Sequence, residues 1–94
     1  MDTVLRLIAS PDGSDGSVTI HADASISAAL VDGAEAIERP LDPKRKTYVH
    51  VVRGSVDVNG VHLDGGDAAA LSGESRLAIG HGRQAEVLVF DLAA

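Results

Sequence analysis

The sequence predicts an all-β fold, a single small barrel or sandwich of the jelly-roll type with little or no helix. Short runs of Val, Ile, Leu and Ala are separated by Gly, Asn, Asp and Pro at intervals of about 8 to 12 residues, a spacing typical of sandwiches and barrels. The 94 residues suit one domain, 1–94. Its core must be aliphatic, because the chain has one Phe, one Tyr and no Trp.

Residues 48–71, YVHVVRGSVDVNGVHLDGGDAAAL, carry the clearest strand pattern. Asn59-Gly60 is the signal of a type I′ hairpin turn, and Gly54 offers a place for a bulge or turn. Both faces of the first strand are largely apolar, which predicts that this strand is covered on both sides. The expected strands in this stretch are 48–53, 56–58, 61–63 and 68–71.

The rest of the chain adds strands on both sides of this stretch, to a total of about nine. Segment 25–31 is rich in Ala, which favours helix, but it lacks a cap and Asp32-Gly33 follows at once, so we predict a strand. We expect Asp91 to cap an edge or to pair with an arginine such as Arg6. The further expected strands are 4–9, 17–22, 34–39, 76–79 and 85–92, with loops at 10–16, 41–46 and 80–84.

Composition excludes several functional classes. A formal charge of −6 argues against nucleic-acid and anionic-membrane surfaces. The absence of Cys removes thiolate chemistry and cysteine metal sites, and no residues form a nucleophile elbow, so we expect no catalytic residue. No apolar run is long enough to span a bilayer and no signal-peptide pattern is present, so a cytoplasmic location is expected.

Four stretches, in order along the chain, resemble the C-terminal cupin domain of pirin-like, quercetinase-type bicupins: residues 5–13, 20–24, 48–54 and 88–92. The resemblance implies a cupin barrel over 1–94. In that family the N-terminal cupin resembles the metal-bearing half, linked to quercetin 2,3-dioxygenase activity, and the C-terminal cupin completes the pair.

The resemblance also locates the metal ligands of metal-binding cupins, namely a His-x-His, a Glu and a second-motif His. These positions fall at 40–44, at Thr47 and at 74–77, and none carries the expected ligand. We therefore predict no metal. The alternative is a quercetinase-type dioxygenase in which His21, His50 and His62, with His81 as a further candidate, bind iron, nickel, copper or zinc at a noncanonical site.

Two non-catalytic functions stay open: assembly, and binding of a small apolar ligand in the barrel. The candidate ligand-binding residues are Thr47, Val49, Val51 and His50. For assembly, the expected partner is a second copy, giving a homodimer through the sheet faces, or another cupin domain.

Overall fold

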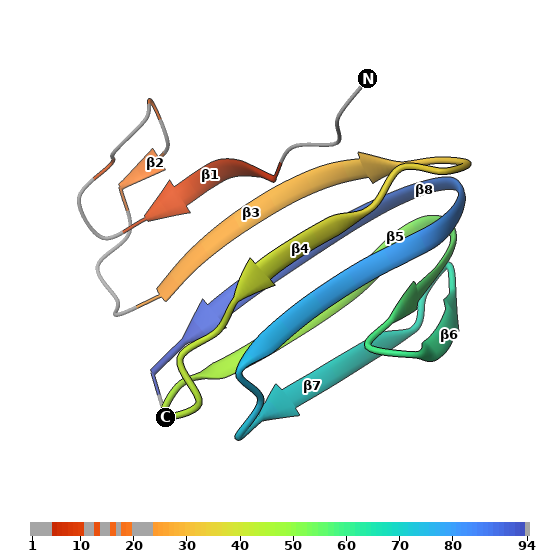
Figure 1. Cartoon of the computed structure of the whole chain (residues 1–94). Coiled ribbons are helices and arrows are strands. Elements are labelled where there is room, and N and C mark those ends of the chain that lie inside the picture. The colour runs from red at the N-terminus through yellow and green to blue at the C-terminus, as the bar shows by residue number, and fades with distance from the viewer. Residues whose placement is uncertain (1–4, 11–12, 14–15, 17, 20–23, 94) are drawn as a thin grey trace.

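The fold is made of strands that follow the predicted alternation of apolar residues (Figure 1). The computed structural model describes residues 5–10, 13, 16, 18–19 and 24–93. Within these residues no helix is long and apolar enough to span a membrane. The strands are β1 (Arg6–Ser10), β2 (Val18–Thr19), β3 (Ala24–Val31), β4 (Ile37–Pro40), β5 (Lys46–Val58), β6 (Val61–Asp64), β7 (Ala68–Ser72) and β8 (Arg76–Leu92).

Two long antiparallel strands, β5 and β8, connect the two layers of the molecule. Figure 1 shows β8 running to one end of the molecule, turning and coming back. Residues 85–92 of β8 and 46–51 of β5 belong to a larger layer, in the order β2-β1-β3-β8-β5-β7. Residues 76–80 and 55–58 belong to a smaller layer, in the order β4-β8-β5-β6. Only the β1–β2 pair is parallel among the described strands.

The core lies between these layers and is aliphatic, as the composition predicts. The cluster combines residues of both layers, and Leu5, Leu41, Ala69 and Leu71 pack against it from the sides. Its buried members are Ala29, Val31, Ile37, Val49, Val51, Val56, Val58, Leu63, Leu77, Ile79, Ala85, Val87 and Val89.

The buried positions of β5 change from odd to even numbers where the strand passes between layers. Val49 and Val51 are buried in the larger layer, whereas Val56 and Val58 are buried in the smaller one. Because side chains alternate along a strand, one inserted residue reverses the buried face. The β5–β8 register shifts on both sides of Gly54, which has a φ of 74°. The bulge therefore keeps apolar side chains in the core of both layers.

Gly54 lies directly against the bend of β8. A Cβ atom at this position would lie 2.4 Å from the carbonyl oxygen of Arg83 and 2.5 Å from that of Gln84. β8 bends there with positive φ at His81 (51°) and Gln84 (48°). Only Gly allows this backbone contact, because any side chain at position 54 would keep β5 and β8 apart at the bend.

The structure confirms several predicted elements. Segment 25–31 is a strand, and Asn59 and Gly60 have the positive φ values, 47° and 85°, that a type I′ turn requires. Of the expected strand 17–22, the described residues form β2, and 20–22 lie outside the described residues. The expected strand 34–39 is shorter and shifted, since β4 is Ile37–Pro40.

One predicted loop is wrong. Segment 80–84 was expected as a loop because of its two glycines, but β8 continues through it by means of two positive-φ residues. At Gly54 the bulge, one of the two predicted alternatives, is confirmed. The expected strands 48–53 and 56–58 therefore form one strand, β5, because β8 supplies a pairing partner on both sides of the bulge.

One expectation about side chains is wrong, and another is confirmed with a different partner. The second face of β5 is not covered, because Tyr48 and Val52 are 39% and 44% exposed. The expectation that Asp91 pairs with an arginine is confirmed, but the partner is Arg45, at 2.8 Å, and not Arg6, because the register places Asp91 beside Thr47 near the start of β5.

We predict that Gly54→Ala destabilises the fold more than Gly73→Ala, a matched control with φ 71° and no atom within 4 Å of the added Cβ. Both variants carry the cost of a left-handed alanine, about 1–2 kcal/mol. Gly54→Ala should lose about 1–3 kcal/mol more, because the backbone of β8 must move. Urea unfolding followed by circular dichroism measures both, and equal losses would contradict the close packing of Gly54 on β8.

Candidate functional site

The candidate ligand-binding residues lie on the first half of β5 but not on one face. Thr47, Val49 and Val51 are buried on the core side, at exposures of 5% or less. His50 lies between them in sequence and points to the opposite face, where it is half-buried. Binding of a small apolar ligand by these four residues stays a prediction.

The candidate histidines lie on different parts of the fold. His50 is on β5, His62 is exposed on β6, and His81 is exposed in the bend of β8. His21 lies outside the described residues. Among the residues that are described, no group of three or more His, Asp and Glu side chains is placed to hold a metal ion. Thr47, at the family position for Glu, offers no carboxylate, so these residues do not fit a standard cupin metal centre.

His62 contacts two carboxylates on the β5–β6 hairpin. Its Nδ1 atom is 2.9 Å from Oδ1 of Asp57, the residue opposite on β5, and its Nε2 atom is 3.2 Å from Oδ1 of Asp64. A neutral imidazole has one N–H group, so only the imidazolium donates to both carboxylates. The hydrogen bond to Asp57, followed by that to Asp64, raises the pKa of His62 above its ordinary value of 6.5.

The larger layer presents an apolar surface on the side away from the core. Directly opposite residues on neighbouring strands point to the same face. One row across the sheet is Ile26, Phe90, Tyr48 and Ala70, and the next is Ala28, Leu88, His50 and Ala68. These eight residues are called the outer face below.

Aromatic packing strengthens the outer face at its centre. The rings of Tyr48 and Phe90 lie edge to face, with centroids 5.8 Å apart and planes at 68°. Charged residues border the face: Lys46 lies at one end, and Arg53 pairs with Glu86 at 3.2 Å at the other. An apolar centre with a charged border is typical of a protein interface. The sequence contains the signal for this surface, since both faces of β5 are apolar, but the pattern was interpreted as burial.

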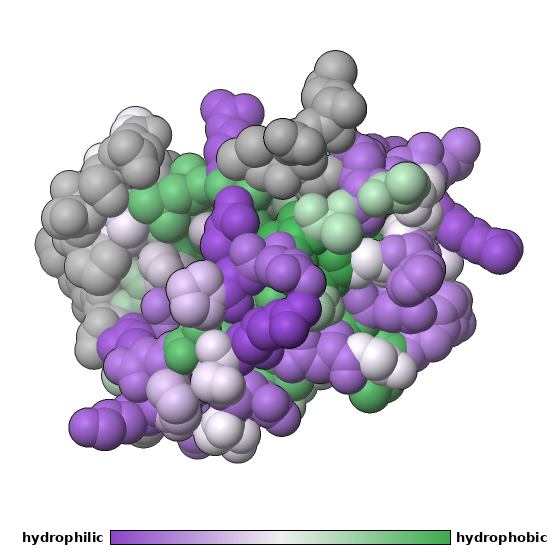
Figure 2. Space-filling view, in the orientation of Figure 1, coloured by the Kyte–Doolittle hydropathy of each residue, from purple (hydrophilic) through white to green (hydrophobic). Residues whose placement is uncertain are grey.

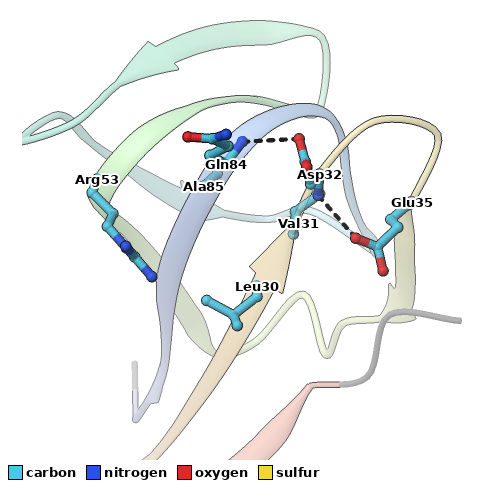
Figure 3. Close-up of a pocket in the computed structure, with 7 residues that line it drawn as sticks. All are labelled: Leu30, Val31, Asp32, Glu35, Arg53, Gln84 and Ala85. Atoms are coloured by element: carbon cyan, nitrogen blue, oxygen red, sulfur yellow. Dashed lines mark hydrogen bonds between the residues drawn. The ribbon is translucent and has the colours of Figure 1, made fainter. Parts of the chain in front are cut away.

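A shallow depression of about 410 Å³ lies next to the bend of β8 (Figure 3). Asp32 accepts a hydrogen bond from the Gln84 amide at 3.0 Å, and its own amide donates to Glu35 at 3.1 Å. These polar groups thus hold the β3–β4 turn against β8. The floor and walls are formed by Leu30, Val31, Asp32, Glu35, Arg53, Gln84 and Ala85. A structural role, the fixing of the β3–β4 turn, accounts for the polar groups of this depression.

Figure 2 shows one face of the molecule. In the orientation of Figure 1, hydrophilic side chains cover most of this surface and hydrophobic ones emerge in small areas between them. A depression of about 460 Å³ lies at the β4–β8 junction and is lined by Glu38, Arg39, Pro40, Ser75 and Arg76. Within it Arg76 pairs with Glu38.

Comparisons with known proteins place this arrangement among the cupins. Residues 7–92 match the family model described as the quercetinase C-terminal cupin domain. Quercetin 2,3-dioxygenase of Escherichia coli K12 is 33% identical over 88 residues, which cover 93% of this chain and 38% of that protein. The chain therefore spans well under half the length of this relative.

Solved structures give the same result. The bacterial pirin YhhW from Escherichia coli, determined in complex with nickel(II), superposes with a TM-score of 0.91 at 31% identity, covering 96% of this chain and 39% of that one. A cupin domain of an XRE family transcriptional regulator from Enterobacter cloacae has a TM-score of 0.75 at 12% identity and supports the fold alone; the match covers 98% of this chain and 97% of that domain.

We predict that the pKa of His62, measured by NMR titration, lies above 6.5. Asp57→Asn should lower it most and Asp64→Asn less, in the order of their contributions, whereas Glu74→Gln in the β7–β8 turn should leave it unchanged. Because the folded-state pKa is raised, the contribution of His62 to stability is complete below pH 6.5 and is lost as the pH rises through the folded-state pKa. A pKa at or below 6.5 would contradict the double contact.

Proposed function

Because the chain belongs to the family of quercetinase C-terminal cupin domains, we propose that it is a metal-free cupin module that acts in assembly rather than in catalysis. Its functional surface is the outer face of the larger layer, which docks a partner cupin domain. The observation that carries the proposal is the apolar character of this face, on which Tyr48 is exposed and packs against the half-buried Phe90.

The ligand positions support a role without a metal. At the family positions for His-x-His, Glu and the second-motif His, this chain has residues 40–44, Thr47 and 74–77, which lack those ligands. The described histidines lie apart, and both ring nitrogens of His62 contact aspartates. The nickel(II) named for the pirin YhhW belongs to a chain of which this one covers only 39%.

The length of the relatives supports a cupin partner. In the Escherichia coli quercetin 2,3-dioxygenase, the matched segment is 38% of the chain, so the larger part of that protein lies outside the equivalent domain. An exposed apolar sheet face is costly to leave in water, and burial gains about 25 cal/mol per Å² of apolar surface. A partner that covers the outer face would remove this cost.

Other occupants are outcomes of the same test. A second copy on the outer face would give the expected homodimer through the sheet faces, and a small apolar ligand would bind on the core side of β5 instead. The dioxygenase alternative needs at least three His or carboxylate groups to converge, with His21, His50 and His62 as the candidates, and it stays a prediction. The cytoplasmic location also stays a prediction.

We predict that Tyr48→Glu abolishes docking, because it places a charge at the centre of the outer face. The control is Val61→Glu, which alters a residue that is 57% exposed on β6 in the smaller layer. The probe is the segment of the Escherichia coli relative outside the match, added to ¹⁵N-labelled chain and followed by NMR. Shifts of Tyr48, Leu88 and Phe90 are expected in the wild type and in Val61→Glu.

Absence of binding, or shifts confined to β4 and β6, would contradict docking through the outer face. Loss of binding in both variants would also contradict it, because the effect would not then be specific to Tyr48.

A further inference from the structure

The edge strands of the two layers differ in how they are protected. Among the described strands, β2, β4, β6 and β7 each pair on one side only. Proteins protect such edges with short strands, charges or proline, because free backbone groups invite pairing. β2 has two residues, β4 carries Glu38, Arg39 and Pro40, and β6 carries His62 and Asp64.

β7 has none of these features. Its five residues, Ala-Ala-Ala-Leu-Ser, contain no charge and no proline, and none of them has a positive φ. The side chains of Ala68, Ala70 and Ser72 are exposed, and all three are small. The edge of the larger layer is therefore open to another strand at β7.

The backbone directions of β7 follow from its pairing with β5. The amide of Val51 donates to the Asp67 carbonyl at 2.9 Å, and its carbonyl accepts from the Gly66 amide at 2.8 Å. In an antiparallel ladder, alternate residues direct both backbone groups to the same neighbour. Val49, two residues before Val51, therefore exchanges backbone hydrogen bonds with Ala69, its opposite residue on β7. The residues whose N–H and C=O groups point away from β5 are Ala68, Ala70 and Ser72.

We propose that the β7 edges of two copies of this chain pair antiparallel about a two-fold axis at Ala70. In this register Ala70 lies opposite Ala70 of the second copy, and Ala68 lies opposite Ser72. Each opposed pair exchanges both of its backbone hydrogen bonds, so all outward groups of β7 are satisfied at once. An isologous contact of this kind closes as a dimer.

The surroundings of β7 fit this occupant. Ala69 and Leu71 pack against the core cluster, so a second β7 continues the apolar side of the sheet. On the other side, Ala70 continues the row of Phe90 and Tyr48 into the second copy. The carboxylate of Asp67 accepts a hydrogen bond from the Asp64 amide at 2.9 Å, and this bond keeps the carboxylate within the β6–β7 turn.

Cysteine cross-linking tests the register directly, because the chain has no Cys. Ala70→Cys places two thiols opposite each other, with Cα atoms about 5.5 Å apart, within the range of a disulfide. The matched control is Ser72→Cys, whose copies are four residues out of register, about 13 Å apart or more. Both side chains are exposed, so neither change disturbs the core.

Under mild oxidation of the folded protein, Ala70→Cys should form covalent dimer about tenfold faster than Ser72→Cys at equal concentration. Circular dichroism verifies that both variants are folded. Equal rates, or no dimer from either variant, would overturn the proposal. The outcome does not depend on docking of a cupin domain to the outer face, because it reports only the register at β7.

Discussion

The architecture depends on one steric constraint, the contact between the backbone of Gly54 and the bend of β8. β5 and β8 stay paired through this bend, because the bulge at Gly54 is matched by positive φ at His81 and Gln84. Four further strands pair directly with these two: β3 and β7 in the larger layer, and β4 and β6 in the smaller one. β1 and β2 then extend the larger layer beyond β3. The enclosed core exists because both strands turn together.

This geometry divides the apolar side chains of β5 and β8 between two environments. Val49, Val51 and Val87 face the core, whereas Tyr48 and Phe90 face outward. The interior of the barrel is thus packed with aliphatic side chains at the strand that would carry a cupin ligand. Apolar surface that is not needed for folding lies on the outside, which is why we assign the function to the outer face and the β7 edge.

Much of the fold is predictable because local signals determine it. The alternation of Val in β5 and the Asn59-Gly60 turn follow from side-chain period and φ preference. The continuity of β8 through 80–84 is not predictable from that segment, because it depends on backbone contact with a residue far away in sequence, Gly54. The same limit applies to Asp91, whose partner Arg45 is set by the β5–β8 register. For the candidate site, the sequence identified β5 but not which of its faces is exposed.

Metal content tests the central claim, a cupin that works without a metal, most directly. Untagged protein would be stripped with a chelator, incubated with iron, nickel, copper or zinc, desalted and measured by inductively coupled plasma mass spectrometry. Our account predicts that no metal is retained in proportion to protein. Retention of one of these metals near one ion per chain would contradict it and would make His21, His50, His62 and His81 the residues to mutate first.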